Sequence, residues 1–529
     1  MEGKRRLIES AKKNHLARYF FLFCIILISA GVRIYKIDKF PGWYSDEGTV
    51  IDISKNLLEG NIQYLSLRSS TIIAARLPFF PLLLAGLFAL FGVNIIVLRV
   101  LVSFLGVISV VLTYILVRKL NKGKQPYLDL LSAFIMGVFP QFITYGRIGF
   151  SYHLLSVLVL IALFGLVNYL INPQKRWVTL FSIAIGVGCV SDLIMFFFIP
   201  AALIVVSLRK LKDLPSALFF LLLPFSSYLL YMSIKDIQVF LFDFGFTMTR
   251  VQGIPLLAQI PLIFLNISSA FTKYTWFAIG CLGLFYVEND NLRKASLITF
   301  YIPIIFLSRT TNYSNLGFYY LIPLMPMVAI GFSTIIYKIT DELVGIMEKF
   351  VESIYSDWNF LPGGKLCLWL RKRSKAIIVS LFLFLVVISP LAASYYQNFL
   401  LNYQTVKNVL VNSEDATHVI DFVNDHAADD DLVIASPALA WAIESNAADF
   451  QQSLAFMGKN TKHFPDDIPR SRFAFNASYL NAKFVILDPI WWNWAVPNME
   501  EVEKMTDLVT QWDLVYQSGD VAVYKNPIK

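Results

Sequence analysis

The sequence predicts a polytopic α-helical membrane protein that carries a small α/β domain outside the membrane. Of its 529 residues, 57% are hydrophobic and 16% are charged, whereas soluble domains carry about 25% charged residues. The chain contains 45 phenylalanines and has a mean hydropathy of +0.60. The chain contains several apolar runs of about 20 residues, which is the length that a helix needs to cross a bilayer. A purely soluble fold is therefore excluded.

The charge of the chain is divided unevenly between two parts. Residues 1–397 hold 36 Lys and Arg against 19 Asp and Glu, and residues 398–529 hold 9 against 18. The basic residues of the first part cluster in short loops between apolar runs, as in the cytoplasmic loops of membrane proteins. The formal net charge of +8 therefore does not indicate nucleic-acid binding. We predict a transmembrane domain at 1–397 and an extracytoplasmic domain at 398–529.

The distribution of lysine and arginine predicts the orientation of the chain. The basic N-terminal segment stays cytoplasmic, and the apolar run at 19–32 lacks a signal-peptide cleavage site, so it is a retained anchor. The first outer loop then covers 35–93. Its apolar block at 77–91 is short and contains two prolines, so we expect it to lie in the outer interface. With this block outside the count of crossings, a single helix at 93–117 crosses the membrane, and the basic loop at 118–124 lies inside as its charge requires.

The same reasoning predicts 11 membrane-spanning helices and a C-terminus outside the membrane. A second short, proline-broken apolar stretch at 254–269 is also placed at the outer interface. The crossings are expected near 19–32, 93–117, 127–145, 151–171, 177–193, 194–208, 215–234, 271–287, 296–308, 315–337 and 376–396.

Residues 398–529 change from continuous apolar runs to short runs separated by polar turns, which indicates a small α/β domain. None of the four cysteines lies there, so a disulfide framework or a zinc site is excluded in this part. We predict helices at 416–426 and 438–445, strands at 431–436 and 483–487, and a strand pair within 513–524. A group of tryptophans can stack on sugar rings or form a docking patch: Trp491, Trp492 and Trp494.

Asp46 and Glu47 form the sharpest chemical feature of the sequence, directly beyond the first predicted helix. Two adjacent carboxylates that face a cavity at the membrane surface can supply a general base and a second ligand or hydrogen-bond acceptor for a sugar or a metal. A helix over 47–58 offers a purely structural alternative, in which Ser45 or Asp46 is the N-cap. The residues themselves leave both interpretations open.

Several basic residues are predicted at the outer ends of membrane helices, where the positive-inside rule makes lysine and arginine rare. Such residues are candidates for binding an anionic substrate. The alternative is that single side chains snorkel to lipid headgroups. The candidates are Arg76, Arg147, Arg250, Lys273 and Arg309, with His153 near Arg147.

Four sequence segments together resemble the polyprenol-phosphate-sugar-dependent glycosyltransferases of the GT-C fold. They are the acidic pair Asp46-Glu47, the run RLPFFPLLLAGLFALFG at 76–92 followed by Leu98-Arg99, the segment YGRIGFSYHLL at 145–155, and YLIPLMP at 320–326. The sequence is most similar to protein O-mannosyltransferases and lipid A aminoarabinose transferases, over residues 15 to about 340. His153 stands where the family usually has an aspartate, and the usual adjacent proline pair is split.

The resemblance implies an inverting transfer of a sugar from a polyprenyl-phosphate donor to a protein, lipid or glycan acceptor at the outer face of the cell membrane. Asp46 would deprotonate the acceptor and Glu47 would orient it. The leaving phosphate would be bound by Arg147, Arg76, Arg309 and Lys273, and the substrate by His153 and Tyr320. No cofactor is implied with certainty, and a divalent cation is compatible with the acidic pair. Membrane lipids are expected partners, and nucleic acid is not.

Two other functions remain as alternatives at this stage. A transporter or flippase of a lipid-linked sugar would be expected to show inverted repeats and helices broken near the bilayer midplane, and neither is clear in the sequence. A scaffold for polymer assembly would not need Asp46 as an acid or a base. The polar residues gather in the outer loops, which favours chemistry at the membrane surface.

Overall fold

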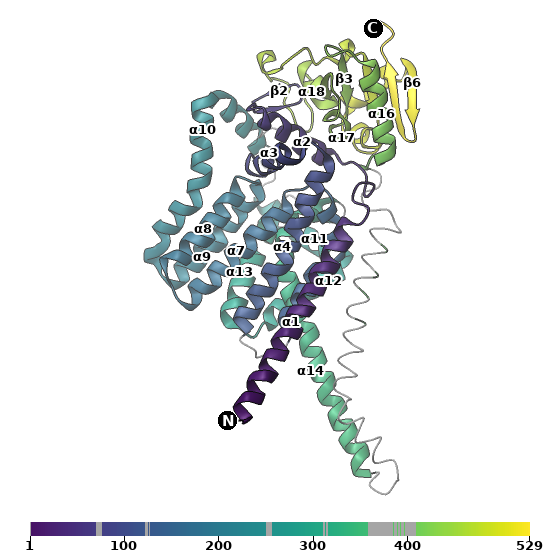
Figure 1. Cartoon of the computed structure of the whole chain (residues 1–529). Coiled ribbons are helices and arrows are strands. Elements are labelled where there is room, and N and C mark those ends of the chain that lie inside the picture. Colours follow the sequence, from purple (N-terminus) through teal and green to yellow (C-terminus); the bar gives the residue numbers. More distant parts are fainter. Residues whose placement is uncertain are drawn as a thin grey trace.

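The protein consists of a helical body with an α/β domain at one end (Figure 1). The computed structural model describes residues 2–69, 77–121, 125, 127–249, 256–309, 313, 316–357, 385, 389, 392, 396 and 409–529. The N-terminal helix and one long helix of the body project from the end opposite the domain (Figure 1). All statements below refer to these described residues.

Five segments are long and apolar enough to cross a membrane by themselves: 16–34, 95–121, 152–171, 211–248 and 317–343. The first three are in helices α1 (Glu2–Ile34), α4 (Ile95–Asn121) and α7 (Tyr152–Ile171). The other two combine a 3-10 helix with the α-helix that follows it, η3 (Leu211–Asp213) with α10 (Leu214–Thr249) and η5 (Leu316–Leu324) with α14 (Met325–Asp357). A sixth span results if the bent pair 128–138 and 140–147 counts as one. The prediction of a multi-pass helical protein is confirmed.

The predicted number of 11 crossings is not confirmed, because several apolar runs are divided into shorter helices. The run at 127–145 becomes α5 (Leu128–Val138), α6 (Pro140–Thr144) and the 3-10 turn η1 (Tyr145–Arg147). Its halves are bent by 56°, because Pro140 at the start of α6 cannot donate the backbone hydrogen bond that would continue α5. Hydropathy measures apolar content and does not locate such breaks.

The remaining helices of the body follow the predicted order with different lengths. The boundary predicted between 193 and 194 lies close to the observed break at 190–192, where the carboxylate of Asp192 accepts a hydrogen bond from Ile194 N at the start of η2. These elements are α8 (Lys175–Cys189), η2 (Leu193–Phe197), α9 (Phe198–Arg209), α12 (Thr275–Gly283), η4 (Leu284–Tyr286), α13 (Asp290–Leu307) and η5 (Leu316–Leu324). The predicted crossing at 376–396 lies outside the described residues except for four isolated positions.

The two stretches predicted at the outer interface are separate helices, α3 (Phe79–Phe91) and α11 (Leu256–Lys273). Helix α3 lies beside α2 (Ser45–Leu58), at the end of the body that carries the domain (Figure 1). Helix α10 extends well beyond the predicted end at residue 234. Its helical geometry breaks at Asp236, with φ −165° and ψ 92°, and the part after this break reaches the level of the domain (Figure 1).

The domain is built on a five-stranded sheet with the order β4-β3-β5-β7-β6. Strands β3 (Leu432–Ala435), β4 (Asn446–Asp449) and β5 (Phe484–Leu487) are parallel, and β6 (Asp513–Ser518) and β7 (Val521–Lys525) continue the sheet as an antiparallel hairpin. The helices are α16 (Ser413–His426), α17 (Pro437–Ala440), α18 (Phe450–Phe456), α19 (Val496–Asn498) and α20 (Glu500–Val509). The predicted elements are present, although α17 is shorter than expected and β4 was missed.

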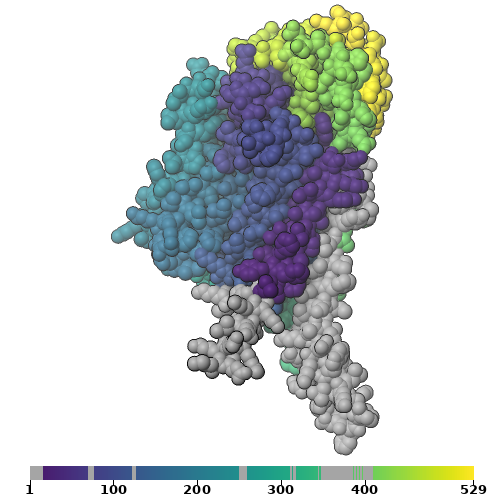
Figure 2. Space-filling view, in the orientation of Figure 1, coloured from purple at the N-terminus to yellow at the C-terminus, as the bar shows by residue number. Residues whose placement is uncertain are grey.

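The first outer loop is enclosed between the body and the domain. Trp43 and Val411 form an antiparallel bridge, and Trp43 packs against Trp441 with ring centroids 5.2 Å apart. A Cβ atom at position 48 would lie 1.8 Å from the carbonyl oxygen of Pro437, so glycine allows α2 to contact α17 directly. The space-filling surface passes from body to domain without a gap (Figure 2).

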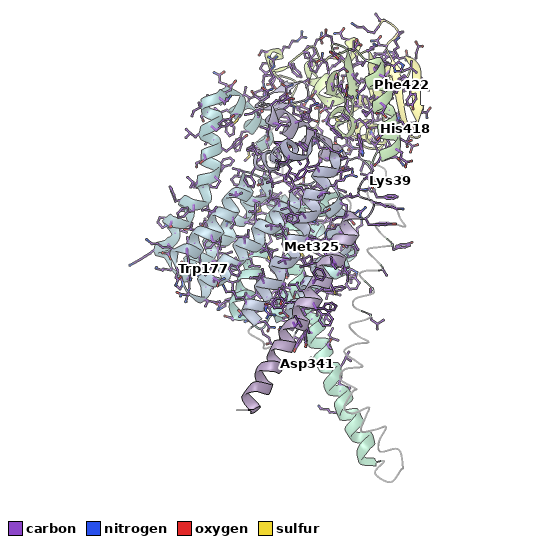
Figure 3. All side chains as sticks on the ribbon, viewed as in Figure 1. Lys39, Trp177, Met325, Asp341, His418 and Phe422 are labelled. Atoms are coloured by element: carbon purple, nitrogen blue, oxygen red, sulfur yellow. The ribbon has the colours of Figure 1, made fainter. Side chains whose placement is uncertain are left out.

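Two ion pairs at the edge of this junction differ greatly in strength. Lys39, labelled in Figure 3 below the domain, lies 2.9 Å from Glu414, and both side chains are more than half exposed, so the pair contributes little. Arg472 in the domain binds both carboxylate oxygens of Asp243 in α10 at 2.6 and 3.0 Å, and this pair is buried. Removal of either partner would leave a buried charge, which costs several kcal/mol (about 3–5).

Two buried acids lie at this junction, Asp449 on the side of the domain and Asp52 within the first outer loop. Tyr64 Oη, in the short strand β1 (Gln63–Tyr64), donates to Asp449 Oδ2 at 3.0 Å. Asp52 accepts a hydrogen bond from Leu65 N at 2.6 Å. Burial raises the pKa of both carboxyl groups to about 6.

This junction should be more stable in mild acid than at neutral pH. The raised pKa values mean that the folded protein favours protonated Asp52 and Asp449, so their contribution is fully present below about pH 4 and is lost as the pH rises through 6. We expect the free energy of unfolding at pH 7.5 to be about 1 kcal/mol per group lower than at pH 5. Thermal unfolding at the two pH values measures the difference, and Asp52→Asn and Asp449→Asn should each remove part of it. An unchanged pH dependence in both variants would contradict this assignment.

Candidate active site

The acidic pair lies in the first turn of α2, at the junction between body and domain. Helix α2 begins at Ser45, and its N-cap is Tyr44. The expected N-cap, Ser45 or Asp46, is therefore wrong, because the helix begins two residues earlier than the pattern indicated. Glu47 Oε2 accepts a hydrogen bond from Tyr44 N at 3.2 Å and completes the cap.

Glu47 is held in a buried ion pair with Arg99 of α4. Arg99 Nε and Nη2 donate to the two carboxylate oxygens, each at 2.8 Å, and neither side chain is exposed. Gly149 N donates to Glu47 Oε1 at 2.8 Å. Arg99 also donates to the carbonyl oxygens of Ile37, at 2.9 Å, and Gly42. These contacts join α2, α4, the end of η1 and the start of the outer loop, so Glu47 fixes the position of its neighbour Asp46.

Asp46 itself is half-buried and interacts electrostatically with Tyr319 of η5. Tyr319 belongs to a group of ring contacts that we call the aromatic cluster. Its centre is formed by Phe150 and Tyr319, with ring centroids 5.1 Å apart, and by Tyr152, which stacks on Tyr319 at 5.0 Å. The cluster consists of Tyr44, Tyr145, Phe150, Tyr152, Phe318, Tyr319 and Tyr320.

Chain segments far apart in sequence therefore meet at Asp46. The rings come from the start of α2, from 145–152 and from η5, and they include Tyr320, which the sequence analysis predicted as a substrate contact. Aromatic side chains offer an apolar face and, in tyrosine, a hydrogen-bonding group at one end. Four of the seven rings are buried, and Tyr44, Tyr319 and Tyr320 are partly exposed, so these three are the rings that a ligand would contact.

Arg147 occupies a different environment from the one that its predicted role suggested. Its side chain is buried, and it donates to the carbonyl oxygens of Val32, Arg33 and Tyr35 at 2.9, 3.1 and 2.7 Å. A cation at the C-terminus of a helix satisfies unpaired carbonyls and complements the helix dipole. These contacts give Arg147 the role of a cap for α1, and its part in donor binding stays a prediction.

His153 lies in the core of the body. It is fully buried, its Nε2 is 3.0 Å from the carbonyl oxygen of Phe142, and its ring packs on Phe142 with centroids 4.4 Å apart. On α7 it faces Arg33 and Phe142. Its predicted contact with substrate is not tested by this arrangement.

Of the remaining predicted cations, Lys273 and Arg309 lie within the described residues. Lys273 is exposed at the end of α11, and the ring of the next residue, Tyr274, lies 4.2 Å from Phe318 of the aromatic cluster. Arg309 Nε donates to Gln259 Oε1 in α11. Arg76 and Arg250 lie outside the described residues.

Asp192 is a second carboxylate near the cluster that sequence reasoning did not select. It is buried, and its Oδ2 accepts a hydrogen bond from Ser151 Oγ at 3.2 Å, directly before Tyr152. The sequence does contain a signal for Asp192, because it is an acidic residue between two apolar runs. An acidic side chain at membrane depth is energetically costly and often functional. Among the described residues, no three His, Cys, Asp or Glu side chains are grouped so that they could hold a metal ion.

Comparison with solved structures identifies the class of protein to which this fold belongs. ArnT from Cupriavidus metallidurans bound to undecaprenyl phosphate matches over 96% of this chain and 97% of its own, with TM-score 0.62 and 12% identity. The apo form gives TM-score 0.63 and 13% identity over 96% and 98%. The apo oligosaccharyltransferase of Archaeoglobus fulgidus gives TM-score 0.53 and 13% identity over 89% of this chain and 69% of its own. The chain therefore has the GT-C fold.

The sequence supplies a second, independent match. Residues 75–232 match the model of a family described as dolichyl-phosphate-mannose-protein mannosyltransferase. A comparison with curated proteins finds no significant match. The resemblance to GT-C glycosyltransferases of the mannosyltransferase and ArnT type is confirmed.

Proposed function

We propose that the protein transfers a sugar from a polyprenyl-phosphate donor to an acceptor at the outer face of the membrane, with inversion at the anomeric carbon. The observation that carries this proposal is the position of Asp46, a half-buried acid that Glu47 and Arg99 hold beside the aromatic cluster. The fold supports it, because a protein with this fold, ArnT, binds undecaprenyl phosphate.

In the proposed reaction, Asp46 accepts the proton of an acceptor hydroxyl. The acceptor oxygen attacks the anomeric carbon as the bond from that carbon to the phosphate oxygen breaks on the opposite face. The electron pair leaves on the polyprenyl phosphate, which is stabilised by nearby cations. This is a single displacement in which the acceptor attacks the face opposite the leaving phosphate, so the configuration at the anomeric carbon is inverted.

Glu47 is a positioning residue in this mechanism. The sequence analysis expected it to orient the acceptor, but both carboxylate oxygens are engaged by Arg99, and by the backbone amides of Gly149 and Tyr44. It acts on the reaction through the placement of Asp46. The test of the function as a whole is the release of polyprenyl phosphate from a polyprenyl-phosphate sugar by the purified protein, with and without acceptor.

Variants of Lys273 and Arg147 distinguish a residue that binds the donor phosphate from a residue that stabilises the fold. Lys273→Ala should raise the KM for the donor about tenfold or more, because a charge-assisted contact to phosphate is lost, while the melting temperature stays unchanged at this exposed site. Arg147→Ala should lower the melting temperature, because five carbonyl contacts at the end of α1 and in the segment after it are lost. Donor titrations and thermal unfolding of both variants measure this. An unchanged donor KM in Lys273→Ala would remove this residue from the proposed phosphate site.

The proposed orientation has the N-terminus in the cytoplasm, and the site and the C-terminal domain outside. In a chain whose four native cysteines are replaced, a cysteine at exposed Glu59 should react with a membrane-impermeant maleimide in intact cells. A cysteine at exposed Lys212 should react only after the membrane is permeabilised. Labelling with the two positions exchanged would invert the topology and place the site inside.

A further inference from the structure

A pocket of about 450 Å³ opens on the C-terminal domain between the segment after β5 and the β6–β7 hairpin. This volume lies within the range of small-molecule sites, about 300–1,000 Å³. The hairpin lies at the edge of the domain away from α2 (Figure 1), so the pocket is distinct from the site around Asp46. Its chemical character is set by Trp492, Asn493, Gln517, Asp520 and Tyr524.

One wall of the pocket contains Trp492, whose backbone belongs to a turn that is anchored in the core of the domain. The chain after β5 forms a π-helical turn at Trp491–Ala495, a conformation that is often found at functional sites. Trp491 is fully buried, and its Nε1 donates to Thr506 Oγ1 at 2.7 Å. The next residue, Trp492, is 43% exposed. Trp491 therefore anchors the turn, and Trp492 presents its ring to solvent.

Polar groups accompany this ring on the same wall and on the opposite one. Asn493 Nδ2 donates to the carbonyl oxygen of Pro489 at 3.0 Å, and Gln517 Nε2 donates to that of Gly519 at 3.2 Å. Both amides are thus held in place. Among the described residues, no hydrogen bond to their carbonyl oxygens is found. They can accept hydrogen bonds from a ligand.

The opposite wall of the pocket is the β6–β7 hairpin, and contacts with α16 hold it in place. Gln517 and Ala522 are partners across the hairpin, and Tyr524 lies on the same face as Ala522, two residues further on. The turn residue Gly519 has φ +51°, and a Cβ there would lie 2.3 Å from Asp415 Oδ2 in α16. Ser518 Oγ donates to Asp415 Oδ1 at 2.7 Å. The hairpin is therefore held on α16, and the pocket is formed before a ligand arrives.

We infer that this pocket binds a neutral pyranose-containing glycan, with one sugar ring stacked on Trp492 and its hydroxyl groups bonded to Asn493, Gln517 and Asp520. An exposed aromatic face beside fixed amides and a carboxylate matches the apolar C–H face and polar rim of a pyranose. The domain carries 9 Lys and Arg against 18 Asp and Glu in residues 398–529, which disfavours an anionic polymer. Under the proposed function, on which this last step rests, the glycan is part of the acceptor.

Binding is measured on the purified full chain, by titration calorimetry with neutral tetrasaccharides of glucose, mannose and galactose. We expect saturable binding of at least one, weakened about tenfold or more by Trp492→Ala and by Gln517→Ala, and largely retained by Trp492→Phe. Leu480→Ala, at an apolar site of the same domain that is 47% exposed, is the matched control and should bind normally. Asp46→Asn should also bind normally, which separates this inference from the proposed function.

Three results would overturn the inference. The first is the absence of saturable binding of every tetrasaccharide, and the second is binding that neither Trp492→Ala nor Gln517→Ala weakens. The third is competition by unglycosylated peptides at equal concentration, which would indicate a peptide site. If transfer fails in all variants while glycan binding follows Trp492, the proposed function fails and the glycan site stands.

Discussion

Asp46→Asn is expected to lower kcat/KM for sugar transfer by about 10²–10⁴-fold, with little change in folding. The amide keeps the shape of the side chain but cannot accept the proton of the acceptor hydroxyl. The N-cap of α2 is Tyr44, and Glu47 completes the cap, so the substitution leaves the start of the helix intact. The loss should appear in kcat, because the substrates still bind.

The matched control is Asp38→Asn, an exposed acid in the same outer loop, which should transfer at the wild-type rate. Transfer is followed as polyprenyl phosphate released per minute, at equal amounts of protein and with the donor verified by mass. Wild-type transfer by Asp46→Asn would remove Asp46 as the base and leave the transporter or scaffold interpretation as the better one. It would leave the assignment of the fold unaffected.

Glu47→Gln is expected to destabilise the protein by about 3–5 kcal/mol, because it leaves the Arg99 guanidinium buried without a counter-charge. The double variant Glu47→Gln/Arg99→Met should recover a large part of this stability, since it removes both charges. Thermal unfolding of the single and double variants measures the coupling between the two residues.

Transfer activity shows whether Glu47 positions Asp46 or only stabilises the protein. The recovered double variant should still transfer slowly, with a lower kcat and a nearly unchanged donor KM, because Asp46 is no longer held in its place. If the double variant regains both stability and kcat, Glu47 has a purely structural role. Equal stability of Glu47→Gln and the wild type would contradict the buried pair itself.

Sequence reasoning located the acidic pair but could not assign roles to its two members. The difference depends on partners that lie 52 and 102 positions away, Arg99 and Gly149, and only tertiary structure brings them to Glu47. Arg147 illustrates the same limit. Its position at an outer helix end was predicted, but the carbonyl groups that surround it come from the end of α1, more than 100 residues earlier.

The fold was predictable wherever apolar content decides the structure. Long apolar runs correctly indicated a multi-pass helical protein, although not the number of its spans, and alternating short runs indicated the sheet of the domain. Strand β4 has the sequence Asn-Ala-Ala-Asp, which has little β-propensity, and it forms because it pairs in parallel with β3. The extension of α10 past residue 234 depends on contacts with the domain, such as Asp243 with Arg472, which a local pattern does not contain.

The enclosure of the first outer loop imposes an order on biosynthesis. Tyr64 and its partner Asp449 are 385 residues apart, so at about 5–20 residues per second a ribosome needs roughly 20–80 s between them. During this interval α2 has reached its final side of the membrane without the surface that later covers it. A chain interrupted before the domain is made would retain its helices in the bilayer but lack a completed site. The enzyme that we propose therefore becomes active only when its last quarter has been synthesised, and incomplete chains should be exposed to chaperones and proteases at that junction.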